Sequence, residues 1–225
     1  MNPPSLRSIR RAEARPGGTG PAPSRPGTIR LELLPVPPAD HRATETPRRP
    51  LPDLLPDGLR ACTFARLDPR RAPEAYRVCQ EYARNGEYEG RRSLFLFGRP
   101  GAGKSSLAAA ILHQVVAQAQ DPHHARFWPL RRSLQAIRET RGQPPAQRLY
   151  LADLVAQPLS ILDQVEEPAS DWEAHQLYLL FETLWAEERR FVLTTDRAAQ
   201  DLQQAFGHVQ VQRLLRLCHL VWVGR

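Results

Sequence analysis

The sequence predicts an α/β fold in which a five-stranded, mostly parallel β-sheet carries helices on both faces. Two observations support this prediction. Short apolar runs alternate along residues 73–224 with segments whose apolar side chains recur every three or four positions. Strands and helices that alternate in this way form parallel sheets buried on both sides. In addition, a glycine-rich turn joins one predicted strand to the helix after it, and that turn contains Lys104.

Lys104 is the only lysine in the chain, although the sequence contains 31 lysines and arginines together. Lysine and arginine carry the same charge but differ in shape. Arginine presents a wide planar fork, whereas lysine presents a compact ammonium group on a thin stem. A single lysine among so many arginines indicates a position where a point charge enters a narrow space.

The residues around Lys104 identify that space as a phosphate-binding loop. Residues 98–105 read GRPGAGKS and match the pattern G-x-x-x-x-G-K-[ST]. An apolar run at 94–97 precedes the motif and a helical apolar pattern follows it, which is the context that a P-loop requires. A chance glycine turn before an ordinary helix is the alternative. We predict nucleotide binding by Gly98, Arg99, Pro100, Gly101, Ala102, Gly103, Lys104, Ser105 and Ser106.

Each residue type in this loop has a physical role. The glycines permit backbone geometries and close approaches that a Cβ atom would block. The loop amides and the N-terminus of the following helix direct donors and partial positive charge at phosphate groups. Lys104 is expected to contact the β- and γ-phosphates, and the Ser105 hydroxyl is expected to coordinate Mg²⁺.

The other elements follow in chain order. A helix begins at Pro73 and ends at Asn85-Gly86, because proline favours the first helical turn and glycine favours the end. After the P-loop strand and its helix, ARFWPL at 125–130 predicts a second strand, and the next helix ends before Pro144. The remaining predicted elements are a helix at 149–155, a strand at 158–163, a helix from the cap Ser170 through Glu188, a strand at 190–196, helices near 197–206 and 209–217, and a strand at 218–224.

The N-terminal region has a different composition. Residues 1–58 are rich in Pro, Gly and Arg and lack apolar periodicity, so we predict a disordered basic tail followed by a folded core at 59–225. Residues 1–50 contain nine arginines against four acidic residues and account for most of the net charge of +7. The tail is interpreted either as an arm that docks a partner or nucleic acid, or as a basic linker.

Cysteine usage and hydropathy predict the compartment. The three cysteines form no C-x-x-C pair, which favours free thiols in a reducing cytoplasm. No apolar run approaches the roughly 18 residues of a membrane span, and the N-terminus lacks the apolar core of a signal peptide. We therefore expect a cytoplasmic protein with no membrane partner.

The order of these motifs resembles the DnaC/IstB branch of the AAA+ ATPases, which is related to the initiator DnaA. The segments that carry the resemblance are GRPGAGKSSLAAAI, PLSILD, RFVLTTD and RLLRLCHLVWVG. It extends from Thr63-Phe64, which resembles the family motif beside the adenine pocket, to the last predicted strand. The resemblance implies an α/β P-loop NTPase fold with an AAA+ core and ATP and Mg²⁺ as cofactors. Because the sequence stops at Arg225, we expect no C-terminal lid domain.

Asp163 ends the apolar run of PLSILD and matches the Walker B carboxylate that holds Mg²⁺ together with Ser105. An aspartate that only caps a loop is the alternative. The next position normally carries the catalytic base, but here it is Gln164, whose amide cannot accept a proton. Asp196 stands where the family usually has a polar sensor asparagine. We therefore expect the protein to bind ATP but to hydrolyse it slowly.

Arg213 matches an arginine that the family places before the last strand and that acts in the site of a neighbouring subunit, so the resemblance implies a nucleotide-dependent homo-oligomer. An ordinary solvated helix residue is the alternative. Together with Lys104, Asp163, Gln164 and Asp196, Arg213 completes the predicted catalytic set.

Two functions remain open. The resemblance implies an ATPase that assists DNA replication by helicase loading, or transposition, through single-stranded DNA and a partner such as a replicative helicase or transposase. Arg131 and Arg138, seven residues apart on one helix, could follow a phosphate backbone or form an ordinary charged face. The alternative function is a nucleotide-gated module that binds ATP with little or no hydrolysis. A small-molecule kinase is disfavoured because no arginine-bearing lid follows the long helix.

Overall fold

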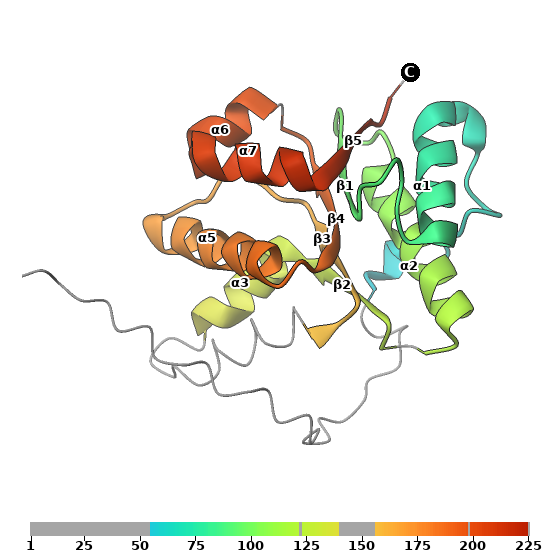
Figure 1. Ribbon diagram of the computed structural model, residues 1–225, viewed down its shortest axis with the longest axis horizontal. Helices are drawn as coiled ribbons and strands as arrows, with labels where there is room; N and C mark the ends of the chain where they lie inside the picture. Colours follow the sequence, from blue (N-terminus) through green and yellow to red (C-terminus); the bar gives the residue numbers. More distant parts are fainter. Residues whose placement is uncertain (1–54, 122, 140–155, 198, 225) are drawn as a thin grey trace, which may run out of the picture. The chain divides into compact units, whose positions relative to one another are not determined.

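Five strands, all parallel, form the centre of the protein in the spatial order β2-β3-β4-β1-β5. The computed structural model describes residues 55–121, 123–139, 156–197 and 199–224 (Figure 1). Most of the predicted tail and the predicted helix at 149–155 lie outside these residues. The strands are β1 Ser93–Phe97, β2 Ala125–Pro129, β3 Leu159–Asp163, β4 Arg190–Thr195 and β5 Cys218–Trp222.

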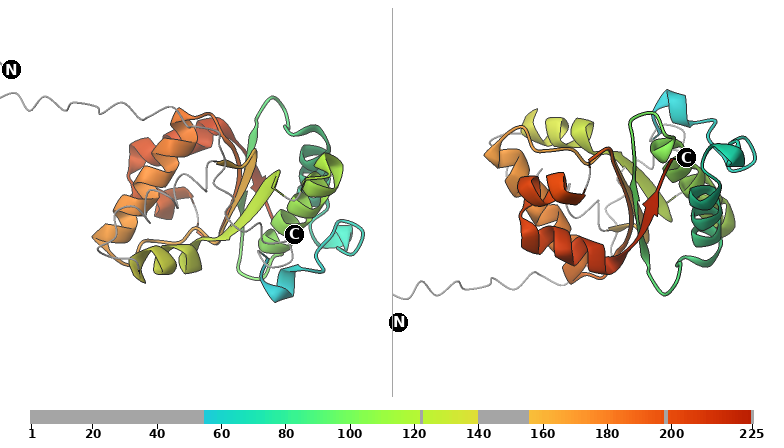
Figure 2. Two further views of the ribbon diagram at one scale, coloured as in Figure 1. Left: turned by 90° about the horizontal axis from the view of Figure 1, so that it is seen from below. Right: turned by 90° about the horizontal axis from the view of Figure 1, so that it is seen from above.

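Helices cover both faces of this sheet (Figure 2). Helices α1 and α2 pack on one face, and α3, α5, α6 and α7 pack on the other. Their bounds are α1 Pro73–Asn85, α2 Lys104–Ala119, α3 Leu130–Glu139, α5 Asp171–Ala186, α6 Ala199–Phe206 and α7 His208–Leu217, with short 3₁₀ turns at Asp57–Leu59 and Pro69–Arg71. The predicted α/β architecture is therefore confirmed.

The two cores follow from the alternation of side chains along each strand. In β1, Leu94 and Leu96 are buried against α1 and α2, whereas Phe95 is buried on the opposite face. In β4, Val192 joins the first core and Phe191 the second. Both faces of the central strands are thus apolar, and their functional side chains are confined to the strand ends.

Local signals define the helix ends. Gly86 adopts a left-handed conformation at the end of α1 and donates its amide to Tyr82. At the start of α5, the hydroxyl of Ser170 accepts the amide of Glu173 at 3.3 Å, while the Glu173 carboxylate accepts the amide of Ala169 at 2.7 Å. Both predicted helix boundaries are confirmed.

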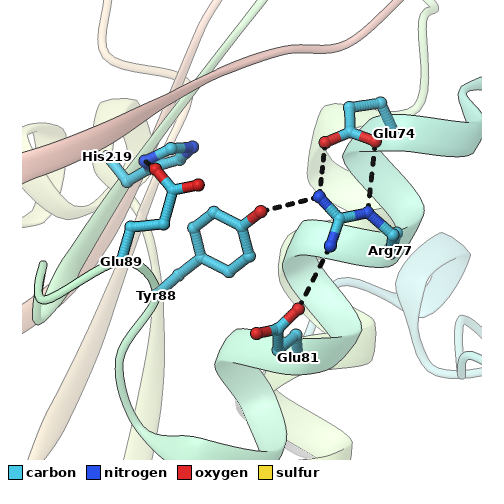
Figure 3. A network of polar contacts seen from close by, with 6 residues as sticks. All are labelled: Glu74, Arg77, Glu81, Tyr88, Glu89 and His219. Atoms are coloured by element: carbon cyan, nitrogen blue, oxygen red, sulfur yellow. Dashed lines mark hydrogen bonds and ion pairs between the residues drawn. The ribbon is translucent and has the colours of Figure 1, made fainter.

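A polar network joins α1 to β5 (Figure 3). The Arg77 guanidinium donates to both carboxylate oxygens of Glu74 and, at 2.7 Å, to the hydroxyl of Tyr88. The Tyr88 ring meets the ring of His219 on β5 edge-on at 4.5 Å, and His219 lies 3.4 Å from the Glu89 carboxylate. These contacts fasten α1 to the edge of the sheet and keep the helix beside the P-loop strand.

Two further features of the structure concern the cysteine thiols and the length of the apolar helices. All three cysteines are free, and burial raises the pKa of the Cys79 and Cys218 thiols, which keeps them protonated. Among the residues that the structure describes, no helix is long and apolar enough to cross a membrane.

Candidate nucleotide-binding site

The P-loop connects the end of β1 to the start of α2 through a backbone that only glycine accommodates. Gly98 has φ +154°, and a Cβ atom there would lie 2.3 Å from the carbonyl oxygen of Val223. Gly103, the residue before α2, has φ +101°. The close approach of Gly98 to the chain after β5 and the positive φ of Gly103 allow the loop to fold back over the helix N-terminus.

Lys104 is the first residue of α2, and its side chain is buried with 6% exposure. Its ammonium group donates to the carbonyl oxygens of Gly98 at 3.0 Å and Arg99 at 2.8 Å, and it forms an ion pair with Asp196 at the end of β4. The single lysine of the chain is therefore buried inside the glycine loop.

Asp163 ends β3 and is almost completely buried. Its carboxylate accepts a hydrogen bond from the Thr194 hydroxyl at 2.7 Å and another from Ser105. Burial raises the pKa of Asp163, and the hydrogen bonds from Thr194 and Ser105 and the charge of Lys104 oppose that increase. A hydroxyl and a carboxylate are hard oxygen ligands, so Ser105 and Asp163 suit Mg²⁺.

A cavity of about 220 Å³ brings seven of the predicted site residues together, whereas Asp163 and four residues of the P-loop (Gly98, Arg99, Pro100 and Ala102) do not line it. The order of the strands explains this convergence, because β3, β4 and β1 are neighbours and their carboxyl ends meet at one edge of the sheet. The cavity is lined by Gly101, Gly103, Lys104, Ser105, Ser106, Gln164, Glu166, Thr194, Thr195 and Asp196.

Gln164 and its acidic neighbours are arranged differently around the cavity. Gln164 has φ +61°, an uncommon value for a residue other than glycine, and its amide donates to the Thr194 hydroxyl at 2.9 Å. Glu166 lines the cavity, but Glu167 does not. Of these two glutamates, only Glu166 therefore borders the space where phosphate is expected.

A second cavity of about 390 Å³ adjoins the first and shares Gly103 and Ser106 with it. Its apolar side chains include Leu67, Tyr76 and Leu107, which suit the flat face of a nucleoside base. The complete lining is Arg66, Leu67, Asp68, Arg71, Ala72, Tyr76, Ala102, Gly103, Ser106 and Leu107.

The sequence indicated the Thr63-Phe64 segment next to this cavity but did not indicate Tyr76. The Tyr76 hydroxyl donates to the carbonyl oxygen of Phe64 at 2.7 Å, and the two rings meet edge-on at 5.4 Å. The Thr63-Phe64 motif therefore located the segment that positions Tyr76. Helical periodicity alone assigned the buried face of α1 and passed over this half-buried tyrosine.

Arg213 does not line either cavity. It lies on α7, forms an ion pair with Glu182 of α5, and places its guanidinium 4.8 Å from the centre of the Trp185 ring. The side chain is 39% exposed. Its action in the site of a neighbouring subunit stays a prediction.

Arg131 and Arg138 are exposed on α3 and line a third cavity of about 570 Å³, which adjoins the first and shares Gln164 and Glu166 with it. Three carboxylates, those of Glu166, Glu167 and Glu173, line the same cavity, and Arg131 lies 3.6 Å from Glu166. The two arginines therefore stand in a mixed-charge environment. Contact with DNA at these positions stays a prediction.

No protein-family model and no curated protein matches this chain. Solved structures do. The DnaC helicase loader aligns with a TM-score of 0.65 and 18% identity over 75% of this chain and 99% of its own. Domain III of DnaA from Thermotoga maritima aligns with a TM-score of 0.60 and 21% identity over 76% of this chain and 68% of its own.

A third structure, the replication initiator DnaA bound to AMPPCP and single-stranded DNA, aligns with a TM-score of 0.61 and 21% identity. This chain spans 51% of that DnaA chain, and 74% of this chain is covered. The resemblance predicted from the motifs is thus confirmed as a likeness of fold. The protein shares its fold, a parallel α/β sheet with a glycine-rich loop after β1, with the DnaC helicase loader and with DnaA.

Proposed function

We propose that this protein binds ATP with Mg²⁺ at the carboxyl edge of its sheet and uses that binding to assist DNA replication or transposition. The observation that carries the proposal is the position of Lys104. Its buried ammonium group lies in a glycine loop at a cavity that also holds the hydroxyl of Ser105. A general need for positive charge does not explain a lysine at this position, because arginine supplies the positive charge everywhere else in the chain.

The two cavities would bind different parts of the nucleotide. Phosphate oxygens would replace the carbonyl and carboxylate oxygens that now surround Lys104, and Ser105 and Asp163 would hold the Mg²⁺. Bound Mg²⁺ neutralises charge on the phosphates. The base would lie against Tyr76 and Leu67 in the adjoining cavity.

Hydrolysis is expected to be slow because Gln164 occupies the place of the base. A glutamine side chain holds a water molecule by hydrogen bonds but cannot take its proton. Asp196, when ionised, cannot donate a hydrogen bond to a phosphate oxygen as an asparagine would. These two residues favour a second candidate function, a module that binds ATP and releases its partner when the nucleotide leaves.

The partners follow from the fold and from the charge of the chain. DnaC is described as a helicase loader, and the DnaA structure contains single-stranded DNA. By analogy, the partners proposed here are single-stranded DNA, with Arg131 and Arg138 as candidate contacts, and a replicative helicase or transposase. Nucleotide-dependent self-association with Arg213 at the interface completes the proposal.

Equilibrium binding of ATP in the presence of Mg²⁺ tests the central statement. Lys104→Ala is expected to abolish binding, because it removes the ammonium group that would contact the phosphates. The melting temperature then measures what the lost hydrogen bonds and ion pair of Lys104 contribute to the free protein. Arg84→Ala, which removes an exposed cation from α1, is the matched control and should bind normally. Equal affinity in Lys104→Ala and the parent would refute the assignment. Phosphate release with and without single-stranded DNA then separates the ATPase from the binding module.

A further inference from the structure

We propose that Thr194 is a positioning residue that holds Asp163 and the chain after it in the geometry needed to bind Mg²⁺. The proposal rests on the proposed function, because it concerns the metal at that site. The Thr194 hydroxyl stands between two groups of the β3 end. It donates to the Asp163 carboxylate at 2.7 Å and accepts the amide of Gln164 at 2.9 Å.

The hydroxyl is held in place by the sheet around it. Thr194 lies on β4, where it is paired with Leu96 of β1, and its side chain is 1% exposed. A β-branched side chain in a strand has few χ1 rotamers, so the oxygen has little freedom to move. The donor reaches the Asp163 carboxylate from a strand buried on both faces, and this fixes the direction in which that carboxylate points.

The same hydroxyl supports an unfavourable backbone conformation. Gln164 has φ +61°, which costs free energy in a residue with a Cβ atom. The hydrogen bond from its amide to Thr194 helps to offset that cost. The next amide, that of Val165, donates to the Thr194 carbonyl oxygen at 2.8 Å, and the Val165 carbonyl oxygen accepts the Thr195 hydroxyl at 2.7 Å.

The last residue of β3, Asp163, and the two residues after it are therefore tied to the end of β4. The result is a chain that leaves Asp163 buried and exposes Gln164 to the nucleotide cavity. Without the Thr194 hydroxyl, a buried carboxylate and a backbone amide would both lose a partner. Residues that orient metal ligands in this way typically contribute about 10–100-fold to metal affinity.

Two matched pairs of variants isolate the hydroxyl. Thr194→Val keeps the branched shape and removes only the oxygen, whereas Thr194→Ser and Thr194→Ala share the loss of the methyl group and differ in the oxygen. Thr183→Val is the control, because Thr183 donates to Leu179 at 2.7 Å on α5, away from the cavity. The measurement is the Mg²⁺ concentration at half-saturation of ATP binding, together with ATP affinity in EDTA and the melting temperature.

The expected result is a rise of about tenfold or more in the half-saturating Mg²⁺ concentration for Thr194→Val and Thr194→Ala. Thr194→Ser and Thr183→Val should stay close to the parent, and ATP affinity in EDTA should change little in all four. If Thr194→Val fails to fold, the comparison of Thr194→Ser with Thr194→Ala tests the role of the hydroxyl instead.

Three outcomes overturn the proposal. Thr194→Val and Thr194→Ala could match the parent in Mg²⁺ dependence. They could also lose metal-dependent and metal-free binding equally, together with a lower melting temperature, which would make Thr194 a structural residue only. A parent that binds no nucleotide under any condition contradicts the proposed function itself and removes the metal role of Thr194 with it.

Discussion

The ammonium group of Lys104 is surrounded by oxygen atoms from two carbonyl groups and from Asp196. An arginine is expected to fit this position less well, because its planar fork is wider than a compact ammonium group. Asp163, unlike Lys104, lies in an environment that disfavours its charge. It is a carboxylate that burial makes unfavourable as an anion, and only hydrogen bonds and the nearby lysine oppose that effect.

Gln164→Glu is expected to raise the rate of phosphate release. The change restores a carboxylate at the edge of the cavity, and general-base assistance typically contributes about 10²–10⁴-fold. ATP affinity should change little, because Lys104, Ser105 and Asp163 remain. The measurement is steady-state phosphate release.

Glu166→Gln and Glu167→Gln are the controls for that experiment, since only Glu166 lines the cavity. The assignment of Gln164 is wrong if the parent already turns over rapidly and Glu166→Gln abolishes the activity. In that case Glu166 is the base.

Asp163→Asn is expected to stabilise the free protein and to abolish its Mg²⁺ dependence. Because the pKa of Asp163 is raised in the folded state, the folded protein holds this proton more tightly than the unfolded chain does. The free energy of unfolding therefore falls as pH rises from the ordinary value near 3.8 through the raised value. Binding of Mg²⁺ has the opposite dependence and is lost as pH falls through the raised pKa.

Thermal melting in EDTA as a function of pH measures this effect. At neutral pH the melting temperature of Asp163→Asn should exceed that of the parent, with about 2–4 °C for each kcal/mol in a chain of this size. Glu167→Gln, which neutralises an exposed carboxylate, should show no such gain. A lower melting temperature for Asp163→Asn would contradict the effect of burial.

The carboxyl ends of three strands, rather than any single helix or loop, form the candidate site. β1 leads into the P-loop, β3 ends at Asp163, and β4 ends at the residues that contact both of them. The edge strand β5 also contributes, because Val223 after it donates its amide to Phe97 at 2.8 Å and lies against Gly98. The start of the P-loop is thus built on the edge of the sheet.

Gly98→Ala is expected to destabilise the protein and to weaken nucleotide binding. The new Cβ atom would lie 2.3 Å from a backbone oxygen of Val223, so the loop or the end of β5 has to shift. Overpacking of this kind typically costs about 1–3 kcal/mol. Thermal melting and ATP binding measure the two effects.

Gly90→Ala and Gly58→Ala separate the effect of the close contact from the effect of the positive φ. Gly90 has a positive φ but nothing within 4 Å of its added Cβ atom, and Gly58 has neither constraint. Gly90→Ala should therefore lose only the stability that the backbone conformation costs, and Gly58→Ala almost none. Equal effects at Gly98 and Gly90 would show that the contact with Val223 is unimportant.

Across the whole molecule, the two cavities draw on segments that are far apart in the sequence. The cavity of about 390 Å³ combines residues 66–76 with the P-loop and the start of α2, and the cavity of about 220 Å³ combines the P-loop with Gln164, Glu166 and residues 194–196. Arg213 lies elsewhere, paired with Glu182 and stacked near Trp185. If Arg213 acts in catalysis, it has to act in a second copy of the chain.

Mixing two inactive variants tests that statement. Lys104→Ala retains Arg213 but lacks the phosphate contact, whereas Arg213→Ala retains its own nucleotide cavity. If Arg213 acts on a neighbouring subunit, the mixture should release phosphate faster than either variant alone. Both changes are best made in the Gln164→Glu background, where turnover is expected to be higher. Full activity of Arg213→Ala by itself would exclude the role.

The sequence by itself determined the features that depend on short spacing. The P-loop, its lysine and its serine lie within eight consecutive residues, and their order between a strand and a helix predicted their geometry. The alternation of apolar strands and amphipathic helices predicted the architecture of the core. The ends of PLSILD and RFVLTTD also predicted that Asp163 and Asp196 stand at the functional edge of the sheet, because the carboxyl ends of parallel strands meet there.

Only the tertiary structure decided which of these residues touch. The hydrogen bonds of Thr194 to Asp163 and to the amide of Gln164 span 31 and 30 residues of sequence, and the ion pair between Lys104 and Asp196 joins β4 to the P-loop. Such contacts depend on strand order and register, which local periodicity does not encode. Thr194 therefore looked like an ordinary strand residue in the sequence, whereas in the folded protein its hydroxyl joins the Asp163 carboxylate to the backbone amide of Gln164.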